Sequence, residues 1–245
     1  MRCGVFLPLI AALGVAVFQL PLEAAKDFSR PGSRKSWKKE DFHSQVGQDE
    51  FVYSVLYGLL GKRNQGYYLE IGAGEPIRIN NTYFFEKNLR WSGVSIDISK
   101  DLVEGWYAAR KNLLLSEDAT RSDYSAILSP FPKVIDYLSL DVDEKYDVVL
   151  EKLFCSNHVF KIITIEHDFY RYGDLYRQRE RTILSKLGYH LLCPNVASDG
   201  NVFEDWWIYP SLFPDDAFSK LTSLDLQSKD FSEILQKVKA ATAVP

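Results

Sequence analysis

Acidic residues stand at or beside the ends of five apolar runs between residues 67 and 166. They are Glu70, Asp97, Asp118, Asp141 and Glu166. In an open α/β sheet the carboxyl ends of the strands lie at one edge, and ligands bind there. We therefore expect these carboxylates to lie near one another. Any one of them could be a helix cap or a turn residue, but a run of five is hard to ascribe to turn chemistry alone.

The first acid lies within a strand that ends in a glycine turn. Gly72 and Gly74 allow a tight turn and a close approach of the backbone to a ligand. A carboxylate at Glu70 would repel a pyrophosphate and attract an ammonium group. Ile77 also stands where a dinucleotide-binding motif has its third glycine. These features count against a nicotinamide cofactor and favour S-adenosylmethionine, which carries an ammonium and a sulfonium group.

Three further positions fit contacts to such a cofactor. Asp97 ends the second strand, where an acid accepts hydrogen bonds from ribose hydroxyls. Asp118 follows the third strand and could accept from an adenine amino group. The segment Asn80-Asn81-Thr82 opens a helix beside the glycine turn, and helix amides there could hold a carboxylate. Helix capping is the alternative role at each of these positions.

The remaining acids predict a site of chemistry. Asp141, Glu166 and His167 should face the group that is transferred, with His167 as a general base near neutral pH. A hydrogen-bonded structural histidine is the alternative for His167. Asp141, Asp143 and Glu166 could bind a divalent metal through oxygen. Acids that cluster at a sheet edge are common, however, and we assign no metal.

Alternating strand and helix patterns position these residues. The strands are expected at 67–71, 94–96, 113–115, 134–140, 160–165, 189–193 and 202–209. The helices are expected at 51–60, 80–89, 102–111, 144–154 and 175–187, with a weaker one at 231–238. This alternation predicts an α/β fold with a mostly parallel sheet and helices on both faces.

The composition of the chain limits the classes of function. The 245 residues carry a net charge of −4, from 29 basic and 33 acidic side chains, which argues against non-specific binding of nucleic acid. The three cysteines, Cys3, Cys155 and Cys193, include no C-x-x-C pair, so neither a zinc site nor a redox dithiol is supported. Cys155 and Cys193 could pair, but two cysteines do not establish an oxidising compartment.

Residues 1–25 resemble a secretory signal peptide, with an uncleaved signal anchor as the alternative. We expect a linker at 26–42, a domain at 43–213 and a C-terminal helical tail at 214–245. The expected location is the secretory pathway or the outside of the cell, with the N-terminal segment as the one candidate for a membrane anchor.

Several motifs occur together in one order: 44–49 (SQVGQD), 68–74 (YLEIGAG), 81–82 (NT), 86–87 (EK), 91–97 (WSGVSID), 136–143 (DYLSLDVD) and 163–167 (ITIEH). In this order they resemble the FkbM-type S-adenosylmethionine-dependent methyltransferases. The resemblance covers about residues 43 to 210 and leaves out the leader and the tail.

The resemblance implies the Rossmann-like class I methyltransferase fold, with seven strands of which the last is antiparallel. It implies that Glu70, Gly72 and Gly74 border the methionine part of the cofactor. The resemblance also implies that Asp97 holds the ribose, that Asp118 lies near the adenine, and that Asp141 and Glu166 face the transfer site. Thr82 belongs to the cofactor-binding set as well, and Gln48 and Asp49 would close over the cofactor.

Two departures from the family pattern bear on these roles. Family members commonly have Glu-Gly where this chain has Asp143-Glu144, which weakens any role for Asp143. A leader peptide would also take the enzyme away from the cytosolic pool of S-adenosylmethionine.

The preferred function is methylation of a hydroxyl on a small-molecule or glycan acceptor, and the oligomeric state is unknown. The alternative is a non-catalytic Rossmann-like binding protein of the secretory pathway, and a nicotinamide oxidoreductase is third. Four aromatic residues could form an acceptor wall or could belong to the core: Tyr170, Tyr172, Trp206 and Trp207.

Overall fold

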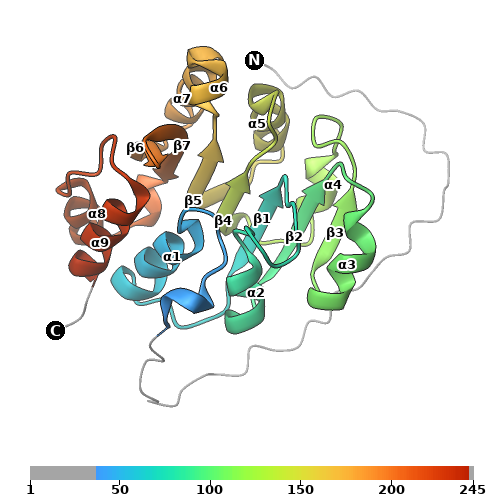
Figure 1. The fold of residues 1–245 in the computed structure, drawn as a ribbon, viewed down its shortest axis with the longest axis horizontal. Helices are drawn as coiled ribbons and strands as arrows, with labels where there is room; N and C mark the ends of the chain where they lie inside the picture. The colour runs from blue at the N-terminus through green and yellow to red at the C-terminus, as the bar shows by residue number, and fades with distance from the viewer. Residues whose placement is uncertain (1–36, 243–245) are drawn as a thin grey trace. The chain divides into compact units, whose positions relative to one another are not determined.

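The computed structural model describes residues 37–242, which contain one seven-stranded sheet (Figure 1). The strands are β1 Tyr67–Ile71, β2 Ser92–Asp97, β3 Leu113–Ser116, β4 Val134–Leu140, β5 Val159–Glu166, β6 His190–Ser198 and β7 Asn201–Ile208. Their order in the sheet is β3-β2-β1-β4-β5-β7-β6. The first five strands are parallel, and β7 runs antiparallel to both of its neighbours. This is the strand order of the class I methyltransferase fold, as predicted.

Helices lie on both faces of the sheet. The α-helices are α1 Gln48–Tyr53, α2 Tyr83–Leu89, α3 Leu102–Ala109, α4 Tyr124–Leu128, α5 Tyr146–Phe154, α6 Phe169–Tyr172, α7 Asp174–Lys186, α8 Asp215–Thr222 and α9 Phe231–Thr242. Short 3-10 turns occupy η1 Lys39–Asp41 and η3 Pro210–Leu212, and a π-helical segment, η2 Ser54–Leu59, continues α1.

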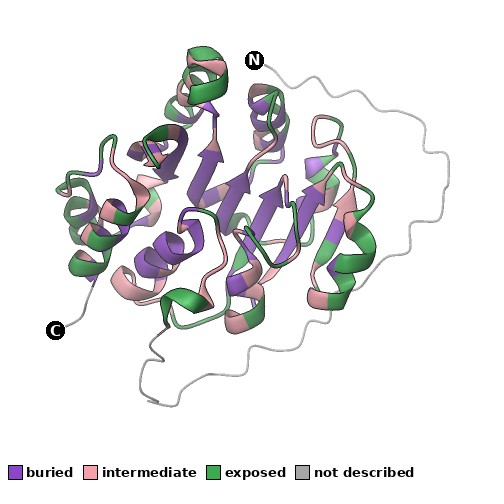
Figure 2. Ribbon diagram, in the orientation of Figure 1, coloured by how far each residue is buried: buried purple, intermediate pink, exposed green. Residues whose placement is uncertain are grey.

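Two apolar clusters pack against opposite faces of the sheet. The first cluster joins the sheet to α1, η2, α2, α8 and α9, whereas the second joins it to α4, α5 and α7. Successive residues of one strand belong to different clusters, since side chains alternate along a strand. Tyr68 of β1 lies in the first cluster, and Leu69 and Ile71 lie in the second. Figure 2 shows the strands buried between exposed helical surfaces.

Several expected elements differ from the structure at their ends. The helix expected from residue 80 begins at Tyr83, because the Asn80 side chain accepts hydrogen bonds from the backbone N–H groups of Thr82 and Tyr83 at 3.0 and 2.8 Å. The helix expected at 51–60 is α1 followed by the π-helical η2. The short helices α4, α6 and α8 were not predicted.

Other predictions concern the cysteines and the N-terminus. No disulfide joins Cys155, which is exposed, to Cys193, which is buried. The expected leader at 1–25 lies outside the described residues, as does most of the expected linker. Within residues 37–242, no helix combines the length and the apolar character that crossing a bilayer requires.

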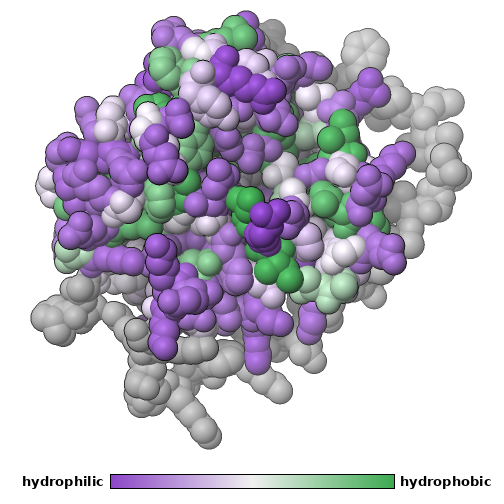
Figure 3. Space-filling model, in the orientation of Figure 1, coloured by the Kyte–Doolittle hydropathy of each residue, from purple (hydrophilic) through white to green (hydrophobic). Residues whose placement is uncertain are grey.

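The loop between β1 and α2 holds an isoleucine in the left-handed region. Ile79 has φ 55°, and its side chain is 48% exposed. Figure 3 shows hydrophobic side chains near the centre of the view, where Figure 1 places this loop. A β-branched residue is strained in this conformation, whereas glycine adopts it freely.

We expect Ile79→Gly to raise the free energy of unfolding by about 1 kcal/mol, because it removes this strain. Urea denaturation measures the change. The control is Ile77→Gly, since Ile77 is similarly exposed and has no positive φ. The control should lower stability, and an equal loss in both variants would contradict the prediction.

Candidate active site

Two rows of residues cross the sheet on the face that carries α1 and α2. In the lower row, Glu70 of β1 lies in register with Ser95 of β2 on one side and Ser139 of β4 on the other. Ser139 in turn lies beside Thr164 of β5. All four are buried, so a polar strip runs under the carboxyl ends of the central strands.

The upper row lies two residues further along β2, β1, β4 and β5, and β7 adds one residue to it. It consists of Asp97, Gly72, Asp141, Glu166 and Glu204. Backbone hydrogen bonds of 2.8 Å continue the sheet to this level, from Gly72 to the carbonyl of Ile96 and from Asp141 to that of Ile71. Glu166 is paired directly with Glu204 across β5 and β7. Gly72, which has no side chain, therefore lies between Asp97 on one side and Asp141 on the other.

Gly72 is required at its position by its neighbours. It has φ 79°, and a Cβ built on it would lie 1.5 Å from the carbonyl oxygen of Asp141. Gly74 also has a positive φ, of 58°, but nothing lies within 4 Å of the place where its Cβ would be. The turn is therefore tightly packed at Gly72 and open at Gly74.

Asp97 braces the glycine turn. One carboxylate oxygen accepts from the N–H of Gly74 at 2.9 Å, and the other accepts from the N–H of Ser99 at 2.8 Å. A carboxylate has about four lone-pair sites, so Asp97 retains capacity for ribose hydroxyls. The structure therefore places Asp97 at the open side of the turn, in contact with the glycine loop.

Asp118 lies in a turn of its own after β3. Its Oδ1 accepts from the N–H and the hydroxyl of Thr120 at 2.9 and 2.7 Å. These hydrogen bonds lower the pKa of Asp118. The side chain is 36% exposed and lies 3.6 Å from Arg121. The turn role is thus visible in the structure, and Asp118 does not belong to either row.

Glu70 and Thr82 lie beneath the glycine turn. Glu70 is 2% exposed and accepts from the Ser95 hydroxyl at 2.7 Å. Burial raises the pKa of Glu70, and the charge of Arg110 acts in the opposite direction. Thr82 is fully buried, and its hydroxyl accepts from Arg110 at 2.8 Å. Neither side chain lies on the open side of the turn, so both can support a cofactor only from below.

Asn81 carries an unsatisfied oxygen next to the lower row. Its Nδ2 donates to the hydroxyl of Ser139 at 2.9 Å. Its Oδ1 is buried and finds no donor among residues 37–242. A buried polar oxygen without a partner is costly, so a ligand that brings a donor, such as an ammonium group, would fit this position.

Asp141 and Glu166 form a carboxyl pair in the upper row. Burial raises the pKa of Asp141 to about 6. Burial and the neighbouring charge of Asp141 raise the pKa of Glu166 much further, because two close carboxylates cannot both ionise readily. At neutral pH the pair therefore shares one proton, which Glu166 holds, and Asp141 is available to accept another.

His167 lies inside the protein, behind this pair. Its ring is fully buried, and its Nδ1 accepts from the N–H of Phe169 at 3.2 Å. Its Nε2 lies 3.5 Å from Asp205, which also binds Arg181 at 2.6 Å. Both ring nitrogens thus face protein atoms, so Asp141 is better placed than His167 to accept a proton from a ligand.

Glu204 is a site residue that sequence reasoning missed. It is 2% exposed and accepts from Gln48 Nε2 at 3.0 Å. Burial raises its pKa to about 8. Two adjacent acids, Glu204 and Asp205, within an apolar strand were the available signal. Gln48 therefore reaches the upper row, whereas Asp49 caps its own loop by accepting from Ser44 Oγ at 2.5 Å.

The four aromatic candidates divide between core and surface. Trp206 packs on Phe51 with ring centroids 4.5 Å apart, and Trp207 is buried in the second cluster. Both tryptophans are therefore core residues. Tyr172 packs on Tyr176, and Tyr170 is 59% exposed. An acceptor wall made of all four residues is not formed.

The carboxylates do not converge as metal ligands would. The Asp143 side chain is 80% exposed and lies 3.6 Å from Arg171. No group of three or more His, Cys, Asp or Glu side chains in the described part of the chain has the arrangement of a metal site.

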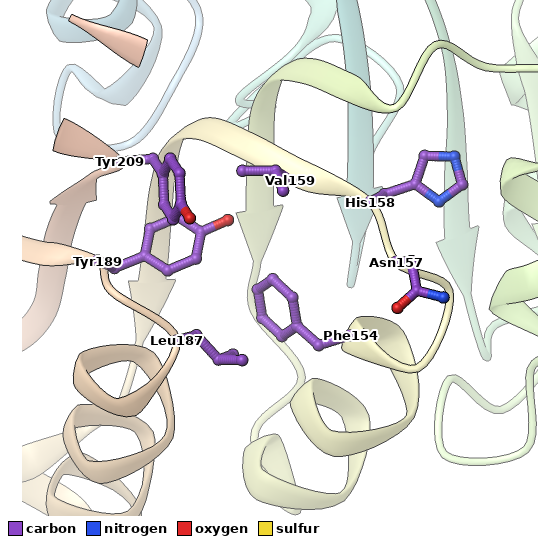
Figure 4. Close-up of a pocket in the computed structure, with 7 residues that line it drawn as sticks. All are labelled: Phe154, Asn157, His158, Val159, Leu187, Tyr189 and Tyr209. Atoms are coloured by element: carbon purple, nitrogen blue, oxygen red, sulfur yellow. The ribbon is translucent and has the colours of Figure 1, made fainter. Parts of the chain in front are cut away.

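A cavity of about 260 Å³ lies at the other end of the strands. Figure 4 shows the residues that line it: Phe154, Asn157, His158, Val159, Leu187, Tyr189 and Tyr209. Val159 is the first residue of β5, whereas Glu166 is the last. The cavity is therefore separate from the candidate active site.

No family model and no curated protein matches the chain. Among solved structures, it is similar to an O-methyltransferase from Bacillus cereus in complex with SAH, with 13% identity, a TM-score of 0.45 and coverage of 69% of this chain and 83% of that one. It is also similar to magnesium protoporphyrin IX methyltransferase from Synechocystis with bound SAM, with 16% identity, a TM-score of 0.43 and coverage of 66% and 78%. The fold assignment rests on the strand order, and these likenesses add no argument about function.

Proposed function

We propose that this chain is an S-adenosylmethionine-dependent methyltransferase of the FkbM type that methylates a hydroxyl of a small-molecule or glycan acceptor. The observation that carries the proposal is the upper row. It has a glycine without room for a side chain between Asp97 and the proton-sharing pair of Asp141 and Glu166. This row lies at the carboxyl ends of the strands, where ligands bind in open α/β sheets.

The residues of the row and the loop above it fit the proposed cofactor. The open backbone at Gly74 gives room for a close approach, and Asp97 beside it can accept from ribose hydroxyls. The partnerless Oδ1 of Asn81 can accept from an ammonium group. When bound, S-adenosylmethionine would supply an electrophilic methyl group.

Asp141 is the proposed general base. It would accept the proton of the acceptor hydroxyl, while protonated Glu166 donates a hydrogen bond to the Asp141 carboxylate and holds it in place. His167 would act as a positioning residue, because it fixes the backbone that follows Glu166. Its own N–H donates to the carbonyl of Phe203, and its Nδ1 accepts from the N–H of Phe169. We also propose that the protein resides in the secretory pathway, because residues 1–25 resemble a secretory signal peptide.

Calorimetric titration of S-adenosylmethionine into the full-length chain tests the proposal. We expect micromolar binding, and at least about a tenfold weaker affinity for Asp97→Ala, because a hydrogen bond to a charged group contributes about 1.5–3 kcal/mol. Asp216→Ala is the matched control, since this exposed acid lies on α8, outside both rows. It should bind nearly as the wild type does.

Two other outcomes would redirect the proposal. No binding by a folded wild-type chain would refute a cofactor-dependent enzyme. Binding without turnover across a panel of hydroxyl acceptors would favour the non-catalytic binding protein instead.

A further inference from the structure

Arg110 follows α3 and is buried against the underside of the glycine loop. Its side chain is 0% exposed, and its guanidinium carbon lies 4.5 Å from the centre of the Trp106 ring. All three guanidinium nitrogens donate hydrogen bonds. The acceptors are Glu86 at 2.5 Å, Asn80 Oδ1 at 3.0 Å, the Pro76 carbonyl at 3.2 Å, and the Tyr68 and Thr82 hydroxyls at 2.8 Å each.

These bonds hold the loop from Ala73 to Thr82 at several points. Arg110 binds the Pro76 carbonyl directly, and it binds Asn80 near the far end of the loop. Asn80 in turn donates to the carbonyls of Ala73 and Glu75 at 3.1 Å each. The backbone on both sides of Gly74 is thus connected to Arg110 through one side chain.

Arg110 also supplies a positive charge beneath Glu70. The uncharged side chains of Ser95, Thr82 and Asn80 also face Glu70, and the charge of Glu70 acts on the titratable Tyr68 hydroxyl as well. The charge of Arg110 favours the ionised form of Glu70 against the effect of burial. Glu86 offsets the Arg110 charge from α2, so the charges under the turn depend on one another.

Stability alone is a weak reason for this arrangement. A fully buried ion pair often contributes no more stability than apolar residues of similar volume. A planar guanidinium, by contrast, fixes several acceptors in one geometry. Its position under the glycine loop points to a role in shaping that loop.

We propose that Arg110 is a positioning residue of the cofactor site, which fixes the loop from Ala73 to Thr82 through its hydrogen bonds to Pro76, Asn80 and Thr82. This inference rests on the proposed function, since the loop serves S-adenosylmethionine. No contact between Arg110 and the cofactor is required.

The test is calorimetric titration of S-adenosylmethionine into the full-length chain from pH 5.5 to pH 8.5. The main variant is Arg110→Met with Glu86→Gln, which removes the ion pair as a unit and so does not leave Glu86 as an unpaired charge. We expect its dissociation constant at pH 7.5 to be at least about tenfold higher than that of the wild type.

The pH dependence separates charge from shape. Binding by the wild type should weaken as Glu70 becomes protonated on the acid side. Without the Arg110 charge the pKa of Glu70 rises further, so this loss should begin at a higher pH in the double variant. Arg110→Lys keeps the charge but loses the planar guanidinium fork. Its affinity should therefore fall over the same acidic pH range as that of the wild type, which we call the acid limb, while binding is about threefold or more weaker at every pH.

The matched control removes another buried ion pair. Lys62 and Asp136 lie 3.1 Å apart, with side chains 12% and 6% exposed, and Asp136 is near the amino end of β4. Lys62→Met with Asp136→Asn should reduce stability without changing the affinity or the acid limb. If this control changed the affinity and the acid limb as much as the Arg110 variant does, the weaker binding would be due to general destabilisation, and the inference would be overturned.

The remaining outcomes are distinct. Wild-type affinity and an unchanged acid limb in the Arg110→Met, Glu86→Gln variant would overturn the inference and leave the proposed function standing. A wild-type chain that does not bind S-adenosylmethionine would refute the proposed function, and the inference would fail with it.

Discussion

Gly72→Ala is expected to lower the free energy of unfolding by about 4 kcal/mol or more, in the range that marks a backbone clash in a packed region. The added Cβ would lie 1.5 Å from the carbonyl oxygen of Asp141, where no side-chain rotation can relieve the overlap. The φ of 79° adds the strain of a left-handed alanine. Urea denaturation of the two full-length chains measures the difference.

Gly74→Ala is the matched control for this prediction. Gly74 has a similar positive φ of 58°, but open space lies where its Cβ would be. It should therefore show the conformational strain alone, about 1 kcal/mol. Equal losses of stability at Gly72 and Gly74 would show that the contact with Asp141 is absent, which would contradict the tight packing described for this turn.

Asp141→Asn should lower kcat by about 10²- to 10⁴-fold, the usual contribution of a positioned proton acceptor. The same change should raise stability at neutral pH. An amide cannot accept the proton of the acceptor, but it also removes a carboxylate that is unfavourable in its partly buried position. Turnover is measured by formation of S-adenosylhomocysteine with a panel of hydroxyl acceptors, and stability by urea denaturation.

The sign of the stability change follows from the shift in pKa. The folded protein raises the pKa of Asp141 from 3.8 to about 6. A group shifted in this direction favours folding below its unfolded pKa, and this contribution is lost as the pH rises to about 6. The variant should therefore exceed the wild type by about 3 kcal/mol at pH 7.5 and match it near pH 4, since each pKa unit corresponds to about 1.4 kcal/mol. The wild-type kcat should in turn rise with pH through about 6.

Asp143→Asn is the control, because this nearby acid is largely exposed and lies outside the upper row. It should change neither kcat nor stability appreciably. A loss of activity at Asp143 equal to that at Asp141 would contradict the assignment of the base. A variant Asp141→Asn that is less stable than the wild type at pH 7.5 would contradict the described burial.

The order and type of the main elements could be predicted because each strand is a short apolar run followed by a turn signal. The run at 134–140 and β4 have the same bounds, and so do the run at 67–71 and β1. The ends of helices were harder to predict, because they depend on side-chain contacts. Asn80 delays the start of α2 by binding two backbone N–H groups, and the residue type alone did not distinguish this from opening the helix itself.

The candidate site was predicted in part for the same reason. Three of the five strand-end acids, Asp97, Asp141 and Glu166, lie in one row because parallel strands end at one edge of the sheet. Their positions follow from the alternation of side chains along each strand. Asp118 follows the outermost strand, β3, and binds its own turn instead.

By itself the sequence determined the strands, the glycine turn between the first strand and its helix, and the acids that end the strands, because these depend on residues close together in the chain. Only the tertiary structure decided that His167 is enclosed, that Glu204 stands opposite Glu166, and that Arg110 lies beneath the loop. Each of these depends on segments distant in sequence. Burial and hydrogen bonding, which set the charge of a carboxyl and the freedom of a ring nitrogen, arise only where such segments meet.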